Sequence, residues 1–266
     1  MEQRVKVLVN GVLGKMGQEV LRAVCRDPGL EAVACVDVKA SKKEILLPDG
    51  TNSVPLSQDL EQILQSCHPD VLVDFTTAEA VMPAVRTAVK HGIALVVGTT
   101  GLSDADLNEI KGLCQKKRVG AVVAPNFAIA AVVMMHLAKV AARFFDYAEI
   151  IEMHHEQKLD APSGTALATA RDMVQARGSD FIHLVAKKEN IAGSRGGELG
   201  GVALHSVRMP GLLAHQEVIL GAAGQTLRIR LDQINREAFM PGVTLAIKKA
   251  AALKEAVFGL DKLLGL

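Results

Sequence analysis

Two adjacent histidines and a lysine, His154, His155 and Lys158, stand close together near the middle of the chain. The apolar run Ala148 to Met153 before them predicts a β-strand, and neighbouring residues of a strand point to opposite faces. The two imidazoles are therefore poorly placed to chelate one ion, and we expect no metal site. An unperturbed imidazole titrates at about pH 6.5, which suits an acid or base working near neutrality. The trio predicts proton transfer beside a cation.

The turn that follows, Ser163-Gly164-Thr165, leads into a predicted helix, Ala166 to Ala176. The first backbone N–H groups of a helix have no partner within the helix and attract anions. We therefore expect the three turn residues to bind a carboxylate, with Lys158 supplying positive charge. This segment predicts a small anionic substrate.

A second candidate site lies near the N-terminus, where the predicted strand Val5 to Val9 runs into a G-x-x-G-x-x-G turn and a helix ending at Arg26. Glycines in such a turn let backbone N–H groups approach the pyrophosphate of a dinucleotide at the helix start. The predicted cofactor contacts are Gly11, Val12, Leu13, Gly14, Lys15 and Met16.

The next predicted strand, Leu30 to Val36, leads into Asp37, about 20 residues after the last glycine of the turn. An acid at this position typically accepts a hydrogen bond from the adenine ribose and favours NADH. Lys39, Lys42 and Lys43 follow closely and are placed to meet the 2′-phosphate of NADPH. The choice between NADH and NADPH stays open at this point.

Three more turns follow predicted buried strands in this half of the chain. Ligands bind at the carboxyl ends of the strands in open α/β sheets, so we expect these turns to line the cofactor site. They are Asp74 to Thr77, Gly98-Thr99-Thr100-Gly101 and Ala124-Pro125-Asn126-Phe127.

Short apolar strands alternate with helical segments through the first half of the chain, a pattern typical of βαβ units. We expect residues 1–127 to form an α/β domain with a Rossmann-like, doubly wound parallel sheet that binds the dinucleotide. Residues 128–235 are expected to form an α+β domain with a mixed or antiparallel sheet for substrate binding and oligomerisation. The segment 236–266 is expected to be helical and to pack back on the first domain.

The second domain contains three predicted antiparallel strands, Val202 to Arg208, His215 to Leu220 and Thr226 to Leu231. The five glycines of residues 190–201 predict a loop before them. The turn-forming residues from Asp49 to Ser57 predict a second loop, in the first domain.

The composition excludes several classes of partner. The 30 Lys and Arg residues nearly balance the 29 Asp and Glu residues, and aromatic residues make up only 3%. Such a chain has neither the charge nor the aromatic platform for nucleic acid or a membrane surface. The four cysteines lie far apart, the apolar runs are too short to span a bilayer, and the N-terminus does not resemble a signal peptide. We expect a cytoplasmic protein whose partner is a small molecule.

The motifs together resemble the dihydrodipicolinate reductase family, and the resemblance extends over essentially the whole chain. The segment HHEQKLDAPSGTA is similar to the family signature H-H-x-x-K-x-D-A-P-S-G-T-A, which is highly specific. The turn GVLGKMG matches the family's G-x-x-G-x-M-G, and VDFTT, VVGTTG and APNF recur in order. SRGGELGGVALHSVRMPG and REAFMPG resemble the family's flexible loop with its following strand and its C-terminal motif.

The resemblance implies reduction of the cyclic dicarboxylate imine 4-hydroxy-tetrahydrodipicolinate by NADH or NADPH, in lysine (diaminopimelate) biosynthesis. It implies that His154 is the proton donor and Lys158 its catalytic partner, while the cofactor contacts are the positions already named. It also implies a homotetramer formed through the second domain's sheet, and domains that close on their ligands. Many members carry arginine directly after the acid, where Val38 stands here. The substrate contacts implied are His155, Ser163, Gly164, Thr165 and Thr100.

Two other functions share some of these features. Another nicotinamide enzyme of amino-acid metabolism, such as homoserine or aspartate dehydrogenase, shares the glycine turn but gives no reason for the His-His-x-x-Lys segment. A non-catalytic dinucleotide sensor does not need paired histidines beside an anion-binding turn. Turnover of the dicarboxylic imine distinguishes the reductase from both.

Overall fold

The computed structural model describes residues 4–266, so the first three residues of the N-terminal segment considered above lie outside it. The chain forms two compact units. Unit 1 comprises the chain up to Ile129 together with Phe239–Leu266, and unit 2 comprises Ala130–Ala238. Among the described residues, no helix is long and apolar enough to cross a membrane.

Unit 1 is built on an eight-stranded sheet with the order β13-β7-β6-β5-β1-β2-β4-β3. Every neighbouring pair is parallel except β3 and β4. The central strands β5 and β6 are buried along their whole length, as expected of parallel strands covered on both faces. The strands are β1 (Val5–Asn10), β2 (Leu30–Val36), β3 (Glu44–Leu46), β4 (Ser53–Ser57), β5 (Val71–Asp74), β6 (Ala94–Val97), β7 (Ala121–Val123) and β13 (Ala256–Phe258).

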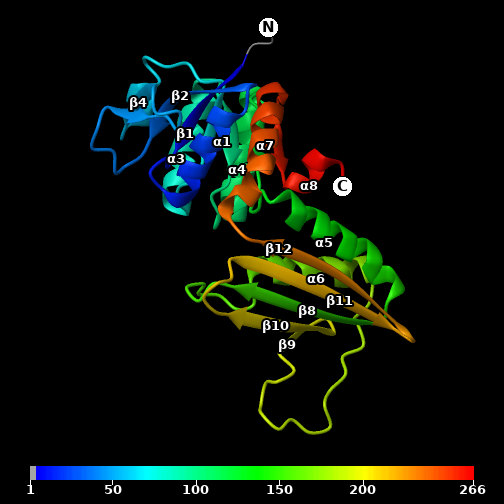
Figure 1. Cartoon of the computed structure of the whole chain (residues 1–266). Helices are drawn as coiled ribbons and strands as arrows, with labels where there is room; N and C mark the ends of the chain where they lie inside the picture. The colour runs from blue at the N-terminus through cyan, green and yellow to red at the C-terminus, as the bar shows by residue number, and fades with distance from the viewer. Residues whose placement is uncertain (1–3) are drawn as a thin grey trace. The chain divides into compact units, whose positions relative to one another are not determined.

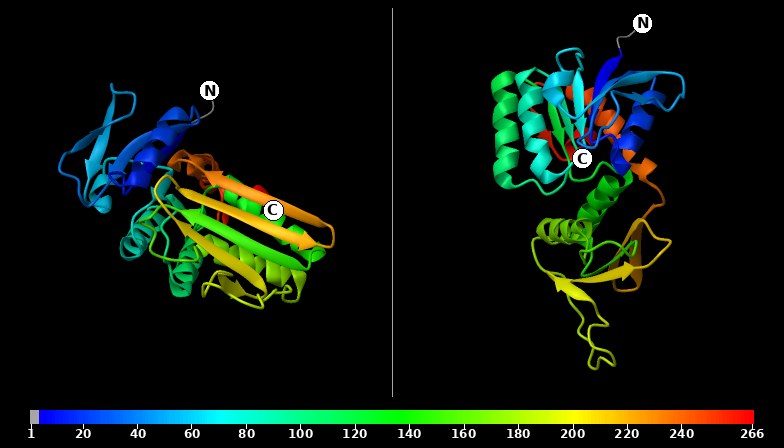
Figure 2. Two further views of the ribbon diagram at one scale, coloured as in Figure 1. Left: turned by 60° about the horizontal axis from the view of Figure 1, so that its bottom comes forward. Right: turned by 90° about the vertical axis from the view of Figure 1, so that its left-hand side faces the viewer.

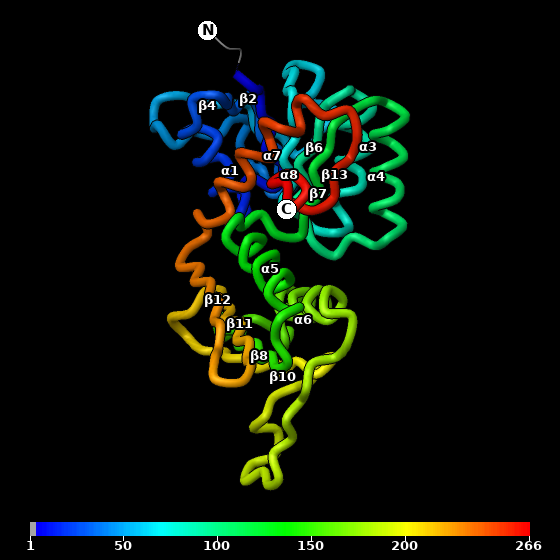
Figure 3. Tube along the Cα trace, turned by 90° about the vertical axis from the view of Figure 1, so that its right-hand side faces the viewer, coloured from blue at the N-terminus to red at the C-terminus, as the bar shows by residue number. Residues whose placement is uncertain are grey.

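Helices cover both faces of this sheet, which confirms the predicted doubly wound, Rossmann-like fold (Figure 3). Helices α1 and α7 lie together on one face, and α3 and α4 lie together on the other. Local sequence explains their ends: Ser103 caps α4 in a capping box with Asp106. The helices of unit 1 are α1 (Lys15–Arg26), α2 (Leu60–Ile63), α3 (Ala78–Lys90), α4 (Asp104–Lys117), α7 (Met240–Ala252) and α8 (Leu260–Leu264).

Two predictions for unit 1 are wrong in part. The predicted loop from Asp49 to Ser57 contains strand β4, whose short alternation of buried Val54 and Leu56 is interrupted by Pro55. The C-terminal segment is not continuous helix. A short 3₁₀ helix, η2 (Arg236–Phe239), precedes α7, and β13 adds an edge strand beside β7 before α8. Three apolar residues between helices carry no period that distinguishes a strand from a helix.

Helix α7 packs closely on unit 1, as Figure 1 shows. A Cβ at Gly242 would lie 2.0 Å from the carbonyl oxygen of Phe127, so only glycine lets the helix approach the turn after β7 this closely. The C-terminal motif therefore has a packing role in unit 1.

Unit 2 contains a five-stranded mixed sheet with the order β12-β11-β8-β10-β9, and helix α6 lies over one of its faces (Figure 2). Strand β10 is parallel to β8, and the other neighbouring pairs are antiparallel. The elements are α5 (Ile129–Ala141), the 3₁₀ helix η1 (Ala142–Phe144), β8 (Tyr147–His154), α6 (Gly164–Arg177), β9 (Gly197–Leu199), β10 (Val202–Arg208), β11 (Ala214–Ala222) and β12 (Gln225–Gln233).

Here too the structure corrects two predictions. Strands β10 and β11 follow one another in the chain but do not pair, because β8 lies between them. The predicted loop over 190–201 includes β9, which pairs with β10 through a tight turn at Gly200 and Gly201, both with positive φ. A strand order is decided by contacts between distant segments, which periodicity does not report.

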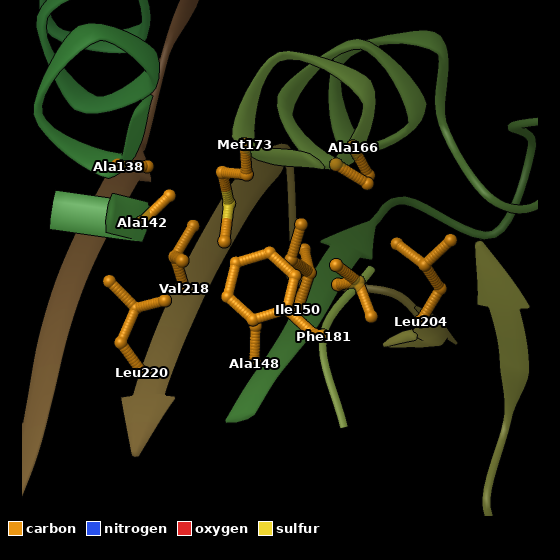
Figure 4. Close-up of a cluster of buried hydrophobic side chains, with 12 residues drawn as sticks. Ala138, Ala142, Ala148, Ile150, Ala166, Met173, Phe181, Leu204, Val218 and Leu220 are labelled. Atoms are coloured by element: carbon orange, nitrogen blue, oxygen red, sulfur yellow. The ribbon is translucent and has the colours of Figure 1, made fainter. Parts of the chain in front are cut away.

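The core of unit 2 lies between α6 and the covered face of the sheet. Met173 of α6 and Phe181 meet Ile150, Val218 and Leu220 of the strands in this layer (Figure 4). Because side chains alternate along β8, the residues that share the core-facing side with Ile150 are Glu152 and His154. The C-terminal end of β8 therefore presents two polar side chains, Glu152 and His154, on the face that forms the core farther back along the strand.

Candidate active site

Unit 1 contains a cavity of about 570 Å³ at the carboxyl end of β1. It is lined by the glycine turn, by the residues that follow β2, by residues 58–61 at the start of α2, and by the turn after β5 with one side of α3. Gly11, Leu13, Gly14 and Asp37, all predicted cofactor contacts, lie in this lining. The cavity therefore forms where the sequence predicts the dinucleotide.

The geometry of the glycine turn fits a dinucleotide. Gly11 has φ +81°, and a Cβ at Gly17 would lie 2.1 Å from the Gly11 carbonyl oxygen, so the turn itself requires both glycines. Helix α1 begins at Gly14 with no side-chain cap and no acid in its first turn. Its first N–H groups and its positive dipole end are therefore left for an anion such as a pyrophosphate.

Asp37 ties the turn to the end of β2. Its carboxylate is 8% exposed and accepts hydrogen bonds from the backbone N–H groups of Leu13 and Lys39, each at 2.9 Å. An ionised carboxylate offers about four acceptor sites, so capacity remains for ribose hydroxyls. Lys39 also lines the cavity, whereas Lys42 and Lys43 line a neighbouring hollow.

A buried polar network joins the ends of β1, β5 and β6. The fully buried Asp74 accepts hydrogen bonds from Asn10 Nδ2 (2.7 Å), Thr99 Oγ1 (2.7 Å) and Thr76 Oγ1 (2.8 Å). The backbone N–H of Thr76 in turn donates to Thr99 Oγ1 at 2.9 Å. The hydroxyl of Thr99, at the end of β6, is thus hydrogen-bonded to both the side chain and the turn that end β5.

Some predicted cofactor residues lie outside this cavity lining. Gly98 has a packing reason of its own, because a Cβ there would lie 2.2 Å from the ring of Phe75. Phe127 is buried with its ring centroid 5.9 Å from that of Phe75, and Thr100 is exposed after β6. The predicted residues outside the lining are Val12, Lys15, Met16, Gly98, Thr99, Thr100, Ala124, Pro125, Asn126 and Phe127.

The cavity also includes residues for which the sequence predicted no specific role. Phe75, Thr76 and Thr77, by contrast, belong to the turn after β5, which the sequence predicted to line the cofactor site. No sequence pattern indicated that α3 lines the cavity, because its small and polar lining residues fit the same helical pattern as their neighbours. The lining residues without a predicted role include Asn10, Gln58, Asp59, Leu60, Glu61, Ala80, Pro83, Ala84 and Thr87.

The histidine site lies in unit 2, at the end of β8. His154 is the last residue of the strand, and its side chain is 15% exposed. Its Nδ1 lies 2.5 Å from Oε2 of Glu152, whose side chain is fully buried. The backbone N–H of Ser163 donates to the other carboxylate oxygen, Oε1, at 3.2 Å. The Nδ1 edge of the imidazole therefore faces a carboxylate in the interior of unit 2.

Arg208, at the end of β10, completes this arrangement. Its Nη1 donates to Glu152 Oε2 at 2.9 Å and its Nη2 to Oε1 at 2.7 Å, a bidentate pair. Burial raises the pKa of Glu152, but the hydrogen bonds from His154, Arg208 and Ser206 outweigh it and bring the pKa to about 2. The carboxylate is therefore ionised at neutral pH.

Lys158 is held by an acid close to it in sequence. Its Nζ lies 2.7 Å from Oδ1 of Asp160, and the two side chains are 23% and 58% exposed. This hydrogen bond lowers the pKa of the Asp160 carboxyl. The ion pair is solvent-accessible, so a substrate carboxylate can compete for the ammonium group.

The turn before α6 presents its backbone. Ser163 is 2% exposed, and its Oγ accepts from the N–H of Ala166 at 3.2 Å as the helix cap. Both polar groups of Ser163 thus already have partners inside the protein. Gly164 is exposed, and Thr165 follows it at the helix start. The backbone N–H groups that remain available to bind an anion are those at the start of α6, on Gly164 and Thr165.

Gly164 has no packing reason to be glycine. A Cβ there would meet no heavy atom within 4 Å, and its φ lies outside the left-handed region. A buried chain of hydrogen bonds steadies the turn from below: Gln216 Nε2 donates to Thr169 Oγ1 (2.9 Å), which donates to the carbonyl of Thr165 (2.8 Å). The exposed amides therefore sit on a fixed backbone.

The structure brings His154, Glu152 and the turn before α6 into one hydrogen-bonded group, and places Lys158 on the loop that joins them. His155 follows the strand and is half-buried. Sequence reasoning assigned no role to Glu152 or Arg208. The spacing of Glu152, two residues before His154 on a strand, was an available signal, because such residues share a face. Among residues 4–266, no group of His, Cys, Asp and Glu side chains is arranged to hold a metal ion.

Comparisons with known proteins find similarity over nearly the whole chain. The sequence profile described as "Dihydrodipicolinate reductase, N-terminus" matches residues 5–127, and that described as "Dihydrodipicolinate reductase, C-terminus" matches residues 130–264. A 4-hydroxy-tetrahydrodipicolinate reductase of Dehalococcoides mccartyi is 54% identical over 262 residues, covering 98% of this chain and 99% of the relative. One from Syntrophomonas wolfei is 48% identical, covering 99% of this chain and all of the relative.

A solved structure shows the same similarity. The dipicolinate-bound dihydrodipicolinate reductase from Paenisporosarcina sp. TG-14 superposes with a TM-score of 0.87 at 39% identity, covering 98% of this chain and 99% of that one. An amine dehydrogenase from Mycobacterium smegmatis, at 16% identity and a TM-score of 0.68, shares the fold.

Proposed function

The chain belongs to the dihydrodipicolinate reductase family, and we propose that His154, Lys158 and the turn before α6 carry out the family's reaction in it. The chain is an NAD(P)H-dependent oxidoreductase that reduces 4-hydroxy-tetrahydrodipicolinate to tetrahydrodipicolinate in lysine biosynthesis. The balanced reaction consumes one hydride and one proton and releases water. The nicotinamide, when bound, supplies the hydride.

His154 supplies the proton in this proposal. Its side chain is 15% exposed at the end of β8, so the outer edge of the ring is accessible while the inner edge faces Glu152. A positioned general acid contributes on the order of 10²–10⁴ in rate. The single observation that carries the assignment is the contact of the imidazole with a buried carboxylate that also accepts from the backbone N–H of Ser163, in the turn before α6.

The substrate carboxylates are held by the amides of Gly164 and Thr165, by the ammonium of Lys158 and by His155. Support for the role of the amides comes from Gly164, because neither its φ nor its neighbours require a glycine at this position. A bare backbone there lets a carboxylate approach the helix start closely. Ser163 contributes indirectly, by capping α6 and by holding Glu152. The role of Thr100 in substrate binding stays a prediction.

The cofactor site is proposed at the cavity of unit 1. The glycine turn and the uncapped start of α1 would hold the pyrophosphate, and Asp37 would accept from the adenine ribose. Of the lysines near Asp37, Lys39 is the one that lines this cavity. Use of both NADH and NADPH is compatible with these residues.

We also propose a cytoplasmic homotetramer. Helix α6 lies over one face of the five-stranded sheet of unit 2, and the exposed fraction of Tyr147 on the other face is 37%. Pairing through that face would bury it. Sedimentation equilibrium of the purified protein tests the tetramer, and a monomeric mass would contradict it.

The function is tested by initial rates with freshly generated 4-hydroxy-tetrahydrodipicolinate, comparing NADH with NADPH. We expect oxidation of the cofactor that depends on the dicarboxylic imine. As controls for the two alternative dehydrogenases, homoserine and aspartate should give no reduction of NAD⁺ or NADP⁺. Absence of substrate-dependent oxidation with both cofactors would refute the proposed function.

Replacing Gly164 by alanine is expected to raise KM for the substrate about tenfold, because a methyl group would intrude where the carboxylate meets the helix start, a loss of about 1.4 kcal/mol. The melting temperature should not fall, since the new Cβ would meet nothing in the protein. Gly17→Ala is the matched control, because its Cβ would lie 2.1 Å from the Gly11 carbonyl oxygen and should destabilise the protein. An unchanged KM in G164A would remove this turn from substrate binding.

A further inference from the structure

Both oxygens of the Glu152 carboxylate accept hydrogen bonds from donors of the protein. Oε1 accepts from Ser163 N and Arg208 Nη2, while Oε2 accepts from Arg208 Nη1 and faces His154 Nδ1 at 2.5 Å. An ionised carboxylate is an acceptor only. The short contact is therefore a hydrogen bond only if His154 carries a proton on Nδ1, and the charge on Arg208 keeps the carboxylate ionised.

We propose that Glu152 is a positioning residue for the reaction: it holds the Nδ1–H of His154 and leaves Nε2 as the atom that gives its proton to the substrate. The inference rests on the proposed role of His154. In the proton-transfer step the Nε2–H bond breaks and a C–H bond forms at the substrate ring carbon. The imidazolium becomes a neutral imidazole, whose remaining proton stays on Nδ1 and is hydrogen-bonded to Glu152. Solvent then supplies a new proton to Nε2.

The arrangement is fixed against rotation of the ring. Glu152 is fully buried, and its guanidinium partner reaches it in a bidentate pair from β10, the parallel neighbour of β8. Arg208 Nη2 also donates to the carbonyl of Asp160 at 2.7 Å, which ties the pair to the loop that carries Lys158. A carboxylate held in this way orients the imidazole as well as selecting its tautomer.

The charged and titratable groups around His154 are accounted for. Glu152 contributes the negative charge on its own strand, and Arg208 the positive charge on the neighbouring strand. The Lys158–Asp160 ion pair lies on the following loop. Among residues 4–266, the group that hydrogen-bonds to the imidazole itself is the carboxylate of Glu152.

The same strand offers a matched control on its opposite face. Glu149 of β8 accepts from Arg195 at 2.5 Å and lies 3.0 Å from Nε2 of His205. This second Glu–His–Arg group points away from the face that bears His154, because 149 and 152 differ by an odd number of residues. Glu149→Gln therefore reports what loss of such a group does to β8 while the Glu152–His154 contact stays intact.

The test combines Glu152→Gln, Glu149→Gln and the unmodified protein. In E152Q we expect kcat to fall about 10²-fold, as for a misoriented catalytic group, with KM for the substrate little changed. E149Q should retain kcat. In ¹⁵N-histidine-labelled protein, above the pH at which His154 loses its Nε2 proton, the His154 ring should be protonated on Nδ1; the signal is assigned by its absence in His154→Gln.

A wild-type spectrum with the proton on Nε2 would overturn the inference, and so would full kcat in a folded E152Q. The spectrum needs no variant at Glu152, so it decides the matter even if that variant fails to fold. Glu152→Asp, which keeps the charge on a shorter side chain, should recover part of the lost kcat. An unmodified protein that does not oxidise NAD(P)H would instead refute the proposed function.

Discussion

Replacing His154 by glutamine is expected to lower kcat about 10³-fold, within the range for loss of a general acid. Glutamine keeps a polar side chain of similar reach but has no proton to give at neutral pH. Dinucleotide binding should be unchanged, since the proposed cofactor residues all belong to unit 1. Initial rates and a fluorescence titration with NADH measure the two effects separately.

His205→Gln is the control for this variant. His205 also faces a glutamate of β8, at 3.0 Å, but on the opposite side of the sheet. It should keep full turnover, whereas an H154Q protein with undiminished kcat would exclude His154 as the proton donor. A fall in both variants would point to damage to the sheet, which the melting temperature would reveal.

Replacing Lys158 by alanine is expected to lower kcat/KM about 10³-fold, through both a lower kcat and a higher KM. Truncating one partner of a buried, hydrogen-bonded charge pair costs about 2–5 kcal/mol. The bound substrate would bury the Lys158 ammonium in the proposed complex. Positioning of the substrate for hydride transfer is lost with it. Steady-state kinetics with the dicarboxylic substrate provide the measurement.

The competing ion pair gives a control of opposite sign. In the free protein Lys158 is paired with Asp160 at 2.7 Å, so binding a substrate carboxylate requires that pair to be exchanged. Asp160→Asn should therefore lower KM while K158A raises it. Equal KM values in K158A and the unmodified protein would show that the ammonium does not contact the substrate.

The elements near both sites were predictable because their signals are local. The helix after the glycine turn and the helix that begins after Ser163 each depend on residues within one turn of helix. The strand before the glycine turn and the strand after α1 follow from short, largely apolar runs, Val5 to Val9 and Leu30 to Val36. In the fold, the strands β3, β4, β9 and β13 were missed. The first three lack the run of consecutive apolar residues that identified the equally short β5, β6 and β7, and the apolar run of β13 lies between two helices.

The cofactor cavity was predicted in part. The glycine turn and Asp37 are recognisable from spacing alone, and the structure places them in one lining. The contribution of α3 depends on how that helix crosses the end of β5, which no local pattern reports. Gly98 illustrates the reverse case, because its neighbour is the ring of Phe75, 23 positions earlier in the chain.

By itself, the sequence determined which residues have the chemistry: the histidine pair, the lysine, the exposed amides before α6 and the phosphate-binding turn. Their types and close spacing carry that information. Tertiary structure alone decided that Arg208 reaches Glu152 across 56 positions, and that this carboxylate faces Nδ1 of His154. The register between β8 and β10 places Arg208 beside His154, and a strand register is set by the packing of a whole face rather than by any one segment.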